Sequence, residues 1–242
     1  MKKIIIVLFA LFLCGEISIN AQSQDFGIWS TIGAKKKLSK KLTASGNVEM
    51  RTRDNVKSID RWSGTLGMSY NIFRFLKVGG EYSYLYSHEP TQVTAKNNII
   101  PDYWYSRHRA TVSVTGSYKI NKLTLSLRER WQYTYRPHKY VDKFDQDGVT
   151  SKEDELVKRQ GKNTFRTRLQ MDYEVFKGLL NPYASCEFYH GGNGLEKTRY
   201  TVGASIKATK HNEFDLFYRY QDMSDDDEVH GHILGIGYTY KF

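Results

Sequence analysis

Apolar and polar residues alternate at every second position through most of this chain. In the segment 42–53, the even positions carry residues such as Leu42 and Val48, and the odd positions carry residues such as Glu49 and Arg51. Successive side chains of a β-strand point to opposite faces, so this pattern predicts strands with one apolar and one polar face. The chain has only four prolines, which suits long uninterrupted strands. We therefore expect an all-β protein.

The alternating segments are long. Most have 10 to 16 residues, whereas strands of soluble proteins usually have about 5 or 6 and a strand crossing a bilayer needs about 9 to 11. No apolar stretch reaches the about 18 residues that a membrane-spanning helix needs. The mean hydropathy of −0.58 averages two opposite strand faces. The eleven segments are 25–36, 42–53, 60–73, 76–87, 103–118, 122–136, 163–176, 182–190, 198–208, 212–221 and 231–242.

The connections between these segments alternate in length. Short turns such as 74–75 and 119–121 are followed by longer polar loops, of which 137–162 and 222–230 are the most charged. Short periplasmic turns and longer extracellular loops are typical of outer-membrane barrels. The fold class predicted is a transmembrane antiparallel up-and-down β-barrel of 10–12 strands.

The alternation leaves the number of strands and the environment of one residue undetermined. Single-chain outer-membrane barrels usually have an even number of strands, so either segment 27–36 runs inside the lumen or two segments have been merged. We expect 10 or 12 strands, with 12 favoured. In segment 122–136, Glu129 falls on the apolar face between Leu127 and Trp131. We predict a β-bulge that returns Glu129 to the polar face.

The first residues have the composition of a secretory signal peptide. Two lysines precede an apolar run over 4–13, and the small residue Ala21 precedes a polar stretch. We predict a signal peptide over 1–21 and a single barrel domain over 22–242. A lipoprotein signal ending at Cys14 is an alternative, which Leu13 disfavours. A buried N-terminal helix or strand is another.

Export determines which partners are expected. Cleavage leaves Cys186 as the only cysteine and reduces the net charge from +10 to +9. An exported chain is not expected to bind nucleic acid, so the positive charge serves the lumen, anionic lipid head groups or solubility. The expected partners are outer-membrane lipid and, during biogenesis, the barrel assembly machinery. We expect a monomer without a cofactor.

The end of the chain carries a resemblance to known proteins. The alternating aromatics Tyr238, Tyr240 and Phe242 resemble the signal that bacterial outer-membrane barrels present to their assembly machinery. Three further segments add to the resemblance: Asp25–Trp29, Lys35–Leu42 and Glu49–Arg51. Together they are similar to an uncharacterised domain-of-unknown-function family of outer-membrane β-barrel proteins from Bacteroidota-type bacteria. The resemblance implies a barrel in the outer membrane and brings no catalytic residues.

The polar face of the strands is rich in charge, and arginines outnumber acids on it. We expect these residues to form a charge network in the lumen, either paired across it or lining a small pore that favours anionic solutes. The predicted network consists of Glu49, Arg51, Arg53, Glu81, Arg107, Arg109, Arg128, Arg130, Arg166, Arg168, Asp172, Glu174, Glu187, Arg199, Glu213, Asp215 and Arg219.

Catalytic and metal-binding motifs are weak. The segment 189–194 loosely resembles the pattern of outer-membrane lipid hydrolases, but Gly192 occupies the position of the serine nucleophile. His230 and His232 are only two candidate metal ligands, and the acidic segment 145–148 departs from the calcium-loop pattern at both ends. We predict no enzyme, no catalytic residue and no metal. The expected role is a small channel or transporter, with a closed structural or surface-binding barrel as the alternative and a lipid hydrolase as the less favoured one.

Overall fold

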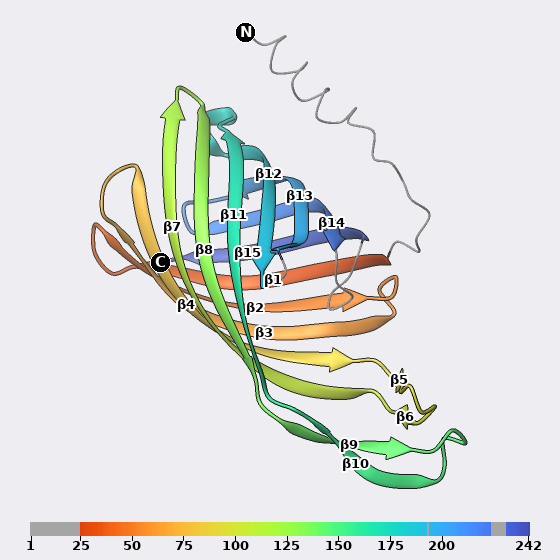
Figure 1. Cartoon of the computed structure of the whole chain (residues 1–242). Coiled ribbons are helices and arrows are strands. Elements are labelled where there is room, and N and C mark those ends of the chain that lie inside the picture. Colours follow the sequence, from red (N-terminus) through yellow and green to blue (C-terminus); the bar gives the residue numbers. More distant parts are fainter. Residues whose placement is uncertain (1–24, 193, 224–230) are drawn as a thin grey trace.

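The computed structural model of the chain is a closed β-barrel of eleven strands (Figure 1). It describes residues 25–192, 194–223 and 231–242, so the predicted signal peptide 1–21, His230 and most of loop 222–230 lie outside the described residues. Within these residues no helix is long and apolar enough to cross a membrane. The strands of the barrel are β1 (Asp25–Lys37), β2 (Leu42–Arg53), β3 (Ser58–Asn71), β4 (Leu76–Glu89), β7 (Tyr103–Ile120), β8 (Leu123–Arg136), β11 (Gln160–Tyr173), β12 (Leu180–Gly191), β13 (Gly194–Lys207), β14 (Asn212–Met223) and β15 (Gly231–Lys241).

The predicted all-β barrel is confirmed, and its strand count falls inside the predicted range of 10–12. The favoured even number is not what the described chain forms, because β1 is a full strand of the wall rather than a segment in the lumen. It pairs antiparallel with β2 and parallel with β15, from Asp25 opposite Gly231 to Lys35 opposite Lys241. All other neighbouring strands of the barrel are antiparallel. The parallel seam places Asp25 at the long-loop end and Phe242 at the short-turn end.

The alternation places apolar side chains on the outer face of the barrel. Ile32, Leu66 and Phe165 are 68%, 70% and 60% exposed, whereas buried apolar side chains are few. Among them are Trp29 and Ile233, which point inward. The hydrophobic surface of this fold therefore faces outward over the whole wall, and the interior is polar.

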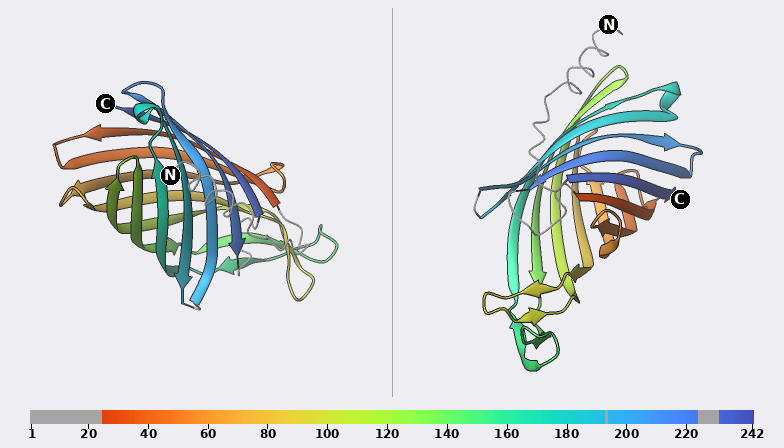
Figure 2. Two further views of the ribbon diagram at one scale, coloured as in Figure 1. Left: turned by 90° about the horizontal axis from the view of Figure 1, so that it is seen from above. Right: turned by 90° about the vertical axis from the view of Figure 1, so that its right-hand side faces the viewer.

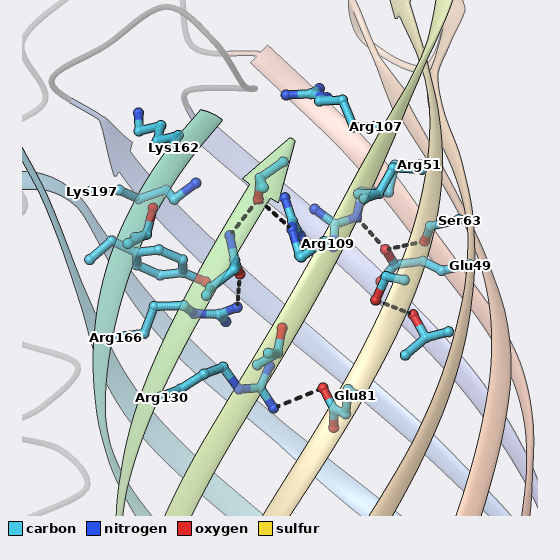
Figure 3. Close-up of a pocket in the computed structure, with 18 of the residues that line it drawn as sticks. Glu49, Arg51, Ser63, Glu81, Arg107, Arg109, Arg130, Lys162, Arg166 and Lys197 are labelled. Atoms are coloured by element: carbon cyan, nitrogen blue, oxygen red, sulfur yellow. Dashed lines mark hydrogen bonds and ion pairs between the residues drawn. The ribbon is translucent and has the colours of Figure 1, made fainter. Parts of the chain in front are cut away.

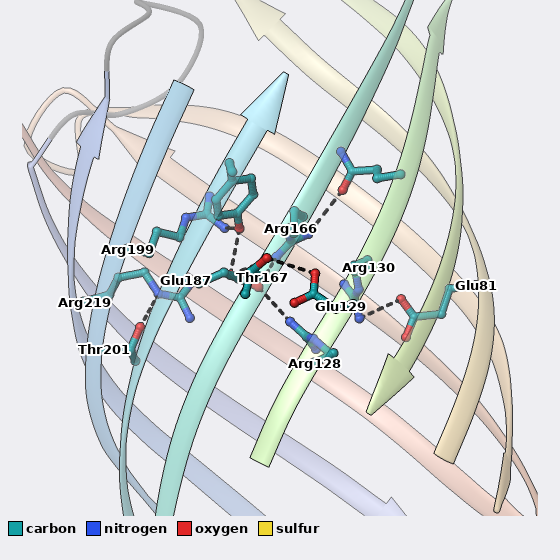
Figure 4. Close-up of polar contacts among 12 residues, drawn as sticks. Glu81, Arg128, Glu129, Arg130, Arg166, Thr167, Glu187, Arg199, Thr201 and Arg219 are labelled. Carbon is teal, nitrogen blue, oxygen red and sulfur yellow. Dashed lines mark hydrogen bonds and ion pairs between the residues drawn. The ribbon is translucent and has the colours of Figure 1, made fainter. Parts of the chain in front are cut away.

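The predicted bulge at Glu129 is wrong. Strand β8 pairs with β11 and with β7 without any register shift, so the strict two-residue alternation keeps Glu129 on the outer face. There its carboxylate accepts a hydrogen bond from the hydroxyl of Thr167, at 2.9 Å. The neighbouring Arg128 and Arg130 point inward (Figure 4).

Two of the long loops build a second sheet beyond the barrel. It contains β5 (Gln92–Val93), β6 (Ile99–Ile100), β9 (Lys139–Phe144) and β10 (Ser151–Val157), in the order β10–β9–β6–β5. Figures 1 and 2 show this sheet continuing past one side of the barrel mouth, beyond the long-loop ends of β7, β8 and β11, and it lies at the lower right of Figure 1. The short turn at the opposite end between β11 and β12 holds a single 3-10 turn, η1 (Phe176–Gly178).

Candidate functional site: a cation-lined lumen

The barrel encloses a cavity of about 760 Å³. Its lining reaches from side chains at the long-loop end, such as Glu89 and Met223, to side chains at mid-barrel, such as Ser45 and Phe217. Figure 3 shows its charged side chains converging from several strands. The inward residues nearest the short turns do not take part in the lining.

Twelve of the seventeen residues of the predicted lumen network line this cavity. They come from eight strands, because every second residue of each strand faces inward. The twelve are Glu49, Arg51, Glu81, Arg107, Arg109, Arg128, Arg130, Arg166, Arg168, Glu187, Arg199 and Arg219.

The other five lie at the ends of the strands, outside the cavity lining. Arg53 lies near the long-loop end, with its guanidinium 3.7 Å from the carboxylate of the neighbouring Asp54 and 3.2 Å from a ring nitrogen of His88. The four acids lie near the short turns, and each has a nearby partner. Asp172 accepts from Gln170, Glu174 from Lys119, Glu213 from Lys241 and Asp215 from the hydroxyl of Tyr183.

Glu187 of β12 is the centre of the lumen network (Figure 4). Its carboxylate accepts hydrogen bonds from Arg128 at 2.8 Å and from the hydroxyl of Tyr189 at 2.9 Å. Nη2 of Arg166 donates to both carboxylate oxygens, at 3.0 Å each. Glu187 is only 6% exposed. Burial of a carboxylate is tolerated when it is paired and hydrogen-bonded, so Glu187 and its arginines stabilise each other.

An aromatic side chain that the predicted lumen network did not include packs against three of its arginines. Trp29 of β1 is 4% exposed. Its ring lies 3.5 Å from the guanidinium of Arg51, 4.8 Å from that of Arg219 and 5.0 Å from that of Arg199. These cation–π contacts hold three arginines at defined positions around one ring. The signal that could have found it is the inward parity of Trp29 in β1.

Further charged residues in and beside the cavity were also missed. Arg61, 2% exposed, pairs in register with Arg51 on the inner face, and it lies on the polar face of segment 60–73. Five others lie near the long-loop ends of the strands, where the sequence pattern gave no reason to separate lumen from loop. These are Glu89, Arg136, Lys162, Glu196 and Lys197.

The charge of the lining is strongly asymmetric. The lining contains twelve arginine and lysine side chains and five glutamates, a net charge of +7. Three adjacent strands, β7, β8 and β11, contribute eight of the cations and no acid, and we call this surface the cationic wall. Its members are Arg107, Arg109, Arg128, Arg130, Arg136, Lys162, Arg166 and Arg168.

Two aromatic side chains lie close against inward-facing glycines of the barrel wall. A Cβ atom on Gly235 would lie 2.0 Å from the ring of Phe217, and one on Gly203 would lie 2.8 Å from the ring of Tyr183. Glycine at both positions is therefore what allows these two rings to lie against the wall.

The weaker motifs find no support in the geometry. His190 is an exposed end-of-strand residue, and Gly192 follows it in a turn. The described residues contain no group of three or more His, Cys, Asp or Glu side chains placed to hold a metal ion. The carboxylates of Asp145 and Asp147 are used by the backbone of their own turn.

The fold and the lumen together define a closed β-barrel with an outward apolar surface and a charged interior. A family model matches residues 26–230, and the chain belongs to that family, the proteins of unknown function DUF2490. A similar solved structure is the beta domain of the Bordetella autotransporter Brka, at 11% identity and a TM-score of 0.48, covering 83% of this chain and 81% of that one. No curated protein matches the chain.

Proposed function

We propose that this protein is an outer-membrane β-barrel that acts as a small channel or transporter for anionic solutes. The observation that carries the proposal is the net charge of +7 on the lining of a 760 Å³ cavity. Planar guanidinium groups bind carboxylate and phosphate groups with two parallel hydrogen bonds. Rings or walls of cationic side chains also favour anions in narrow pores.

The outer-membrane location is supported by the outer surface and the connections. Apolar side chains such as Ile32 and Leu66 are largely exposed there, and a lipid environment would cover them. The long loops then face the outside of the cell and the short turns face the periplasm. In this orientation solutes reach the cationic wall from outside. A signal peptide over 1–21, outer-membrane lipid, and the assembly machinery reading Tyr238, Tyr240 and Phe242 complete the proposal.

Planar-bilayer recording tests the channel. The purified barrel in a potassium chloride gradient should give single-channel steps whose reversal potential indicates preference for chloride. Replacing Arg109 and Arg136 by glutamine should shift the preference toward potassium. The matched control replaces Lys158 and Arg159, two exposed cations between β10 and β11, and should leave it unchanged. A stably inserted but silent barrel would contradict the channel, and potassium preference in the wild type would contradict the anion assignment.

A closed barrel that binds a partner with its loops is the second candidate. It is favoured by the pairing of inward side chains near the short turns, for example Tyr183 with Asp215 and Glu213 with Lys241. Under this alternative the sheet of β5, β6, β9 and β10 is the contact surface. Replacing 139–157, which contains β9 and β10, by a short turn should then abolish partner capture from intact cells while the barrel still inserts. The proposal assigns no catalytic residue, cofactor or metal, and the absence of acyl release from phospholipid vesicles is its expected outcome.

A further inference from the structure

We infer that the cationic wall binds an extended acidic oligosaccharide rather than a single small anion. This inference deepens the proposed function and rests on it, because it names the class of solute for the same cavity. It is carried by the register of β7, β8 and β11, which arranges the cations of the wall in successive rows.

The rows follow directly from strand pairing. Arg109 lies opposite Thr134, which lies opposite Lys162. Two residues further toward the turns, the row contains Thr111, Gln132 and Thr164. The two rows below it are Ser113, Arg130 and Arg166, and then Thr115, Arg128 and Arg168. Above them, Arg136 lies opposite Gln160, and Arg107 comes two residues before Arg109.

The geometry of these rows suits a chain. Inward rows are two residues apart along each strand, which is about 6.6 Å, and five rows extend over about 26 Å. Four of the rows carry cations, so the cations of the wall are distributed along its length rather than concentrated in one row. A single small anion can meet one row, whereas a chain with several linked anionic groups meets several at once and gains affinity through effective concentration.

The uncharged row indicates a ligand that carries hydroxyl groups as well as charge. Thr111, Gln132 and Thr164 line the cavity between the upper and lower cations. Their side chains donate and accept hydrogen bonds but carry no charge. Sugars with carboxylate or sulfate groups present both kinds of group along one chain. A bare polyphosphate can accept hydrogen bonds from this row but offers no donor to its oxygen acceptors.

The acids of the lumen act as a second selective element. Glu187 binds Arg128 and Arg166, and Glu81 lies 3.4 Å from Arg130. These acids reduce the net charge of the two lower rows, so a small anion is not trapped there permanently. A chain already anchored by the upper rows can still compete for the lower arginines. Binding that is strong enough to enter and weak enough to leave is what conduction requires.

The test measures affinity against chain length. Isothermal titration calorimetry on the detergent-solubilised full barrel uses galacturonate chains of one to six units, with neutral maltose-type chains of equal length as controls. The expected dissociation constant falls by about 100-fold from one unit to four and changes little beyond the length of the wall. A length-independent constant, or equal binding of neutral chains, would overturn the inference.

Two further arms separate the causes of each outcome. Polyphosphate of matched charge should bind more weakly than the galacturonate chain, and tighter binding would overturn the sugar assignment. Replacing Arg109 and Arg136 by glutamine should remove most of the length dependence, and the Lys158 and Arg159 control should retain it. Heat-modified migration in detergent gels checks that both variants are folded. A silent barrel in planar bilayers that still binds longer chains more tightly defeats the channel and leaves this inference intact.

Discussion

Two glutamates on opposite faces of the barrel wall differ in their burial and in their hydrogen-bond partners. Glu187 points inward, is almost fully buried, and accepts hydrogen bonds from two arginines and a tyrosine. Glu129 points outward among apolar neighbours, with Val114 opposite it on one side, and accepts one hydrogen bond from Thr167. Figure 4 shows both.

The position of a residue along its strand, odd or even, decides whether its side chain points into the lumen or outward. The residues on the neighbouring strands then decide whether a charge there stabilises or destabilises the barrel. Inside, Glu187 is paired with arginines from neighbouring strands, so its loss leaves those charges uncompensated. Outside, in the proposed lipid environment, no water and no cation compensates a carboxylate. The comparison predicts opposite signs for removing the two charges.

Glu187→Gln should have the largest effect. The neutral amide no longer compensates Arg128 and Arg166, so we expect the free energy of unfolding to fall by about 3–5 kcal/mol. Urea unfolding of the barrel in lipid vesicles, followed by tryptophan fluorescence, measures this loss. The double variant Glu187→Gln/Arg166→Gln should recover part of it, because one unpaired charge is removed. Unchanged stability in the single variant would show that the two faces do not differ as argued.

Glu129→Leu should change stability in the opposite direction. Removing a carboxylate from the outer surface at mid-strand should raise the free energy of unfolding by about 1–2 kcal/mol. The same unfolding assay measures it. The matched control is Leu127→Glu, which places a second carboxylate on the same face of the same strand and should destabilise the barrel. A loss of stability in Glu129→Leu would mean that this carboxylate has a compensating partner in the membrane.

These two residues also show what could be predicted from the sequence. The alternation was sufficient to predict the barrel and to place Arg128 and Arg130 inward. At Glu129 the rule that charge belongs inside was preferred over the alternation, and the structure follows the alternation. The unbroken pairing of β8 with both neighbours explains this, because a bulge would cost hydrogen bonds of two ladders.

Other features required knowledge of which strands are neighbours. The alternation indicates the inward parity of Trp29, and Arg51 lies opposite it on the neighbouring strand β2. The contact of Trp29 with Arg219 of β14 forms only because the barrel closes. The cationic wall likewise depends on β11 pairing with β8 across the long connection 137–159. The parallel closure of β1 on β15 could not be derived from alternation, because a two-residue period carries no strand direction.

Glu213→Gln extends the comparison to an acid that is partly buried, 18% exposed, and not surrounded by lipid. Glu213 pairs with Lys241 near the short turns, and the side chain of Lys241 is 33% exposed. Water shares the solvation of such a pair, so we expect the free energy of unfolding to fall by less than about 1 kcal/mol. The effect should also weaken at high salt, unlike that of Glu187→Gln. A fall in the free energy of unfolding as large as that of Glu187→Gln would mean that ion pairs at the centre and at the short-turn end of the lumen contribute equally to stability.

Asp147 completes the series with a carboxylate in water, in the turn between β9 and β10. It accepts hydrogen bonds from the hydroxyl of Thr150 at 2.5 Å and from the backbone amides of Thr150 and Val149 at 2.9 Å. These hydrogen bonds lower its pKa from the ordinary value of 3.8 to about 2. Because the pKa is lower in the folded turn, the carboxylate stabilises the turn fully above about pH 4. That stabilisation is lost as the pH falls through the folded pKa.

Amide hydrogen exchange can measure the pH-dependent stabilisation by Asp147 separately at this turn. The protection factors of the Val149 and Thr150 amides, corrected for intrinsic exchange, should fall between pH 5 and the region of the folded pKa. The barrel amides of β8 serve as an internal reference and should keep their protection. In Asp147→Asn the turn should lose this pH dependence, because the amide does not titrate. Equal protection of the wild-type turn at both pH values would mean that the water-exposed carboxylate of Asp147 does not stabilise the turn. The comparison would then rest on the two faces of the wall alone.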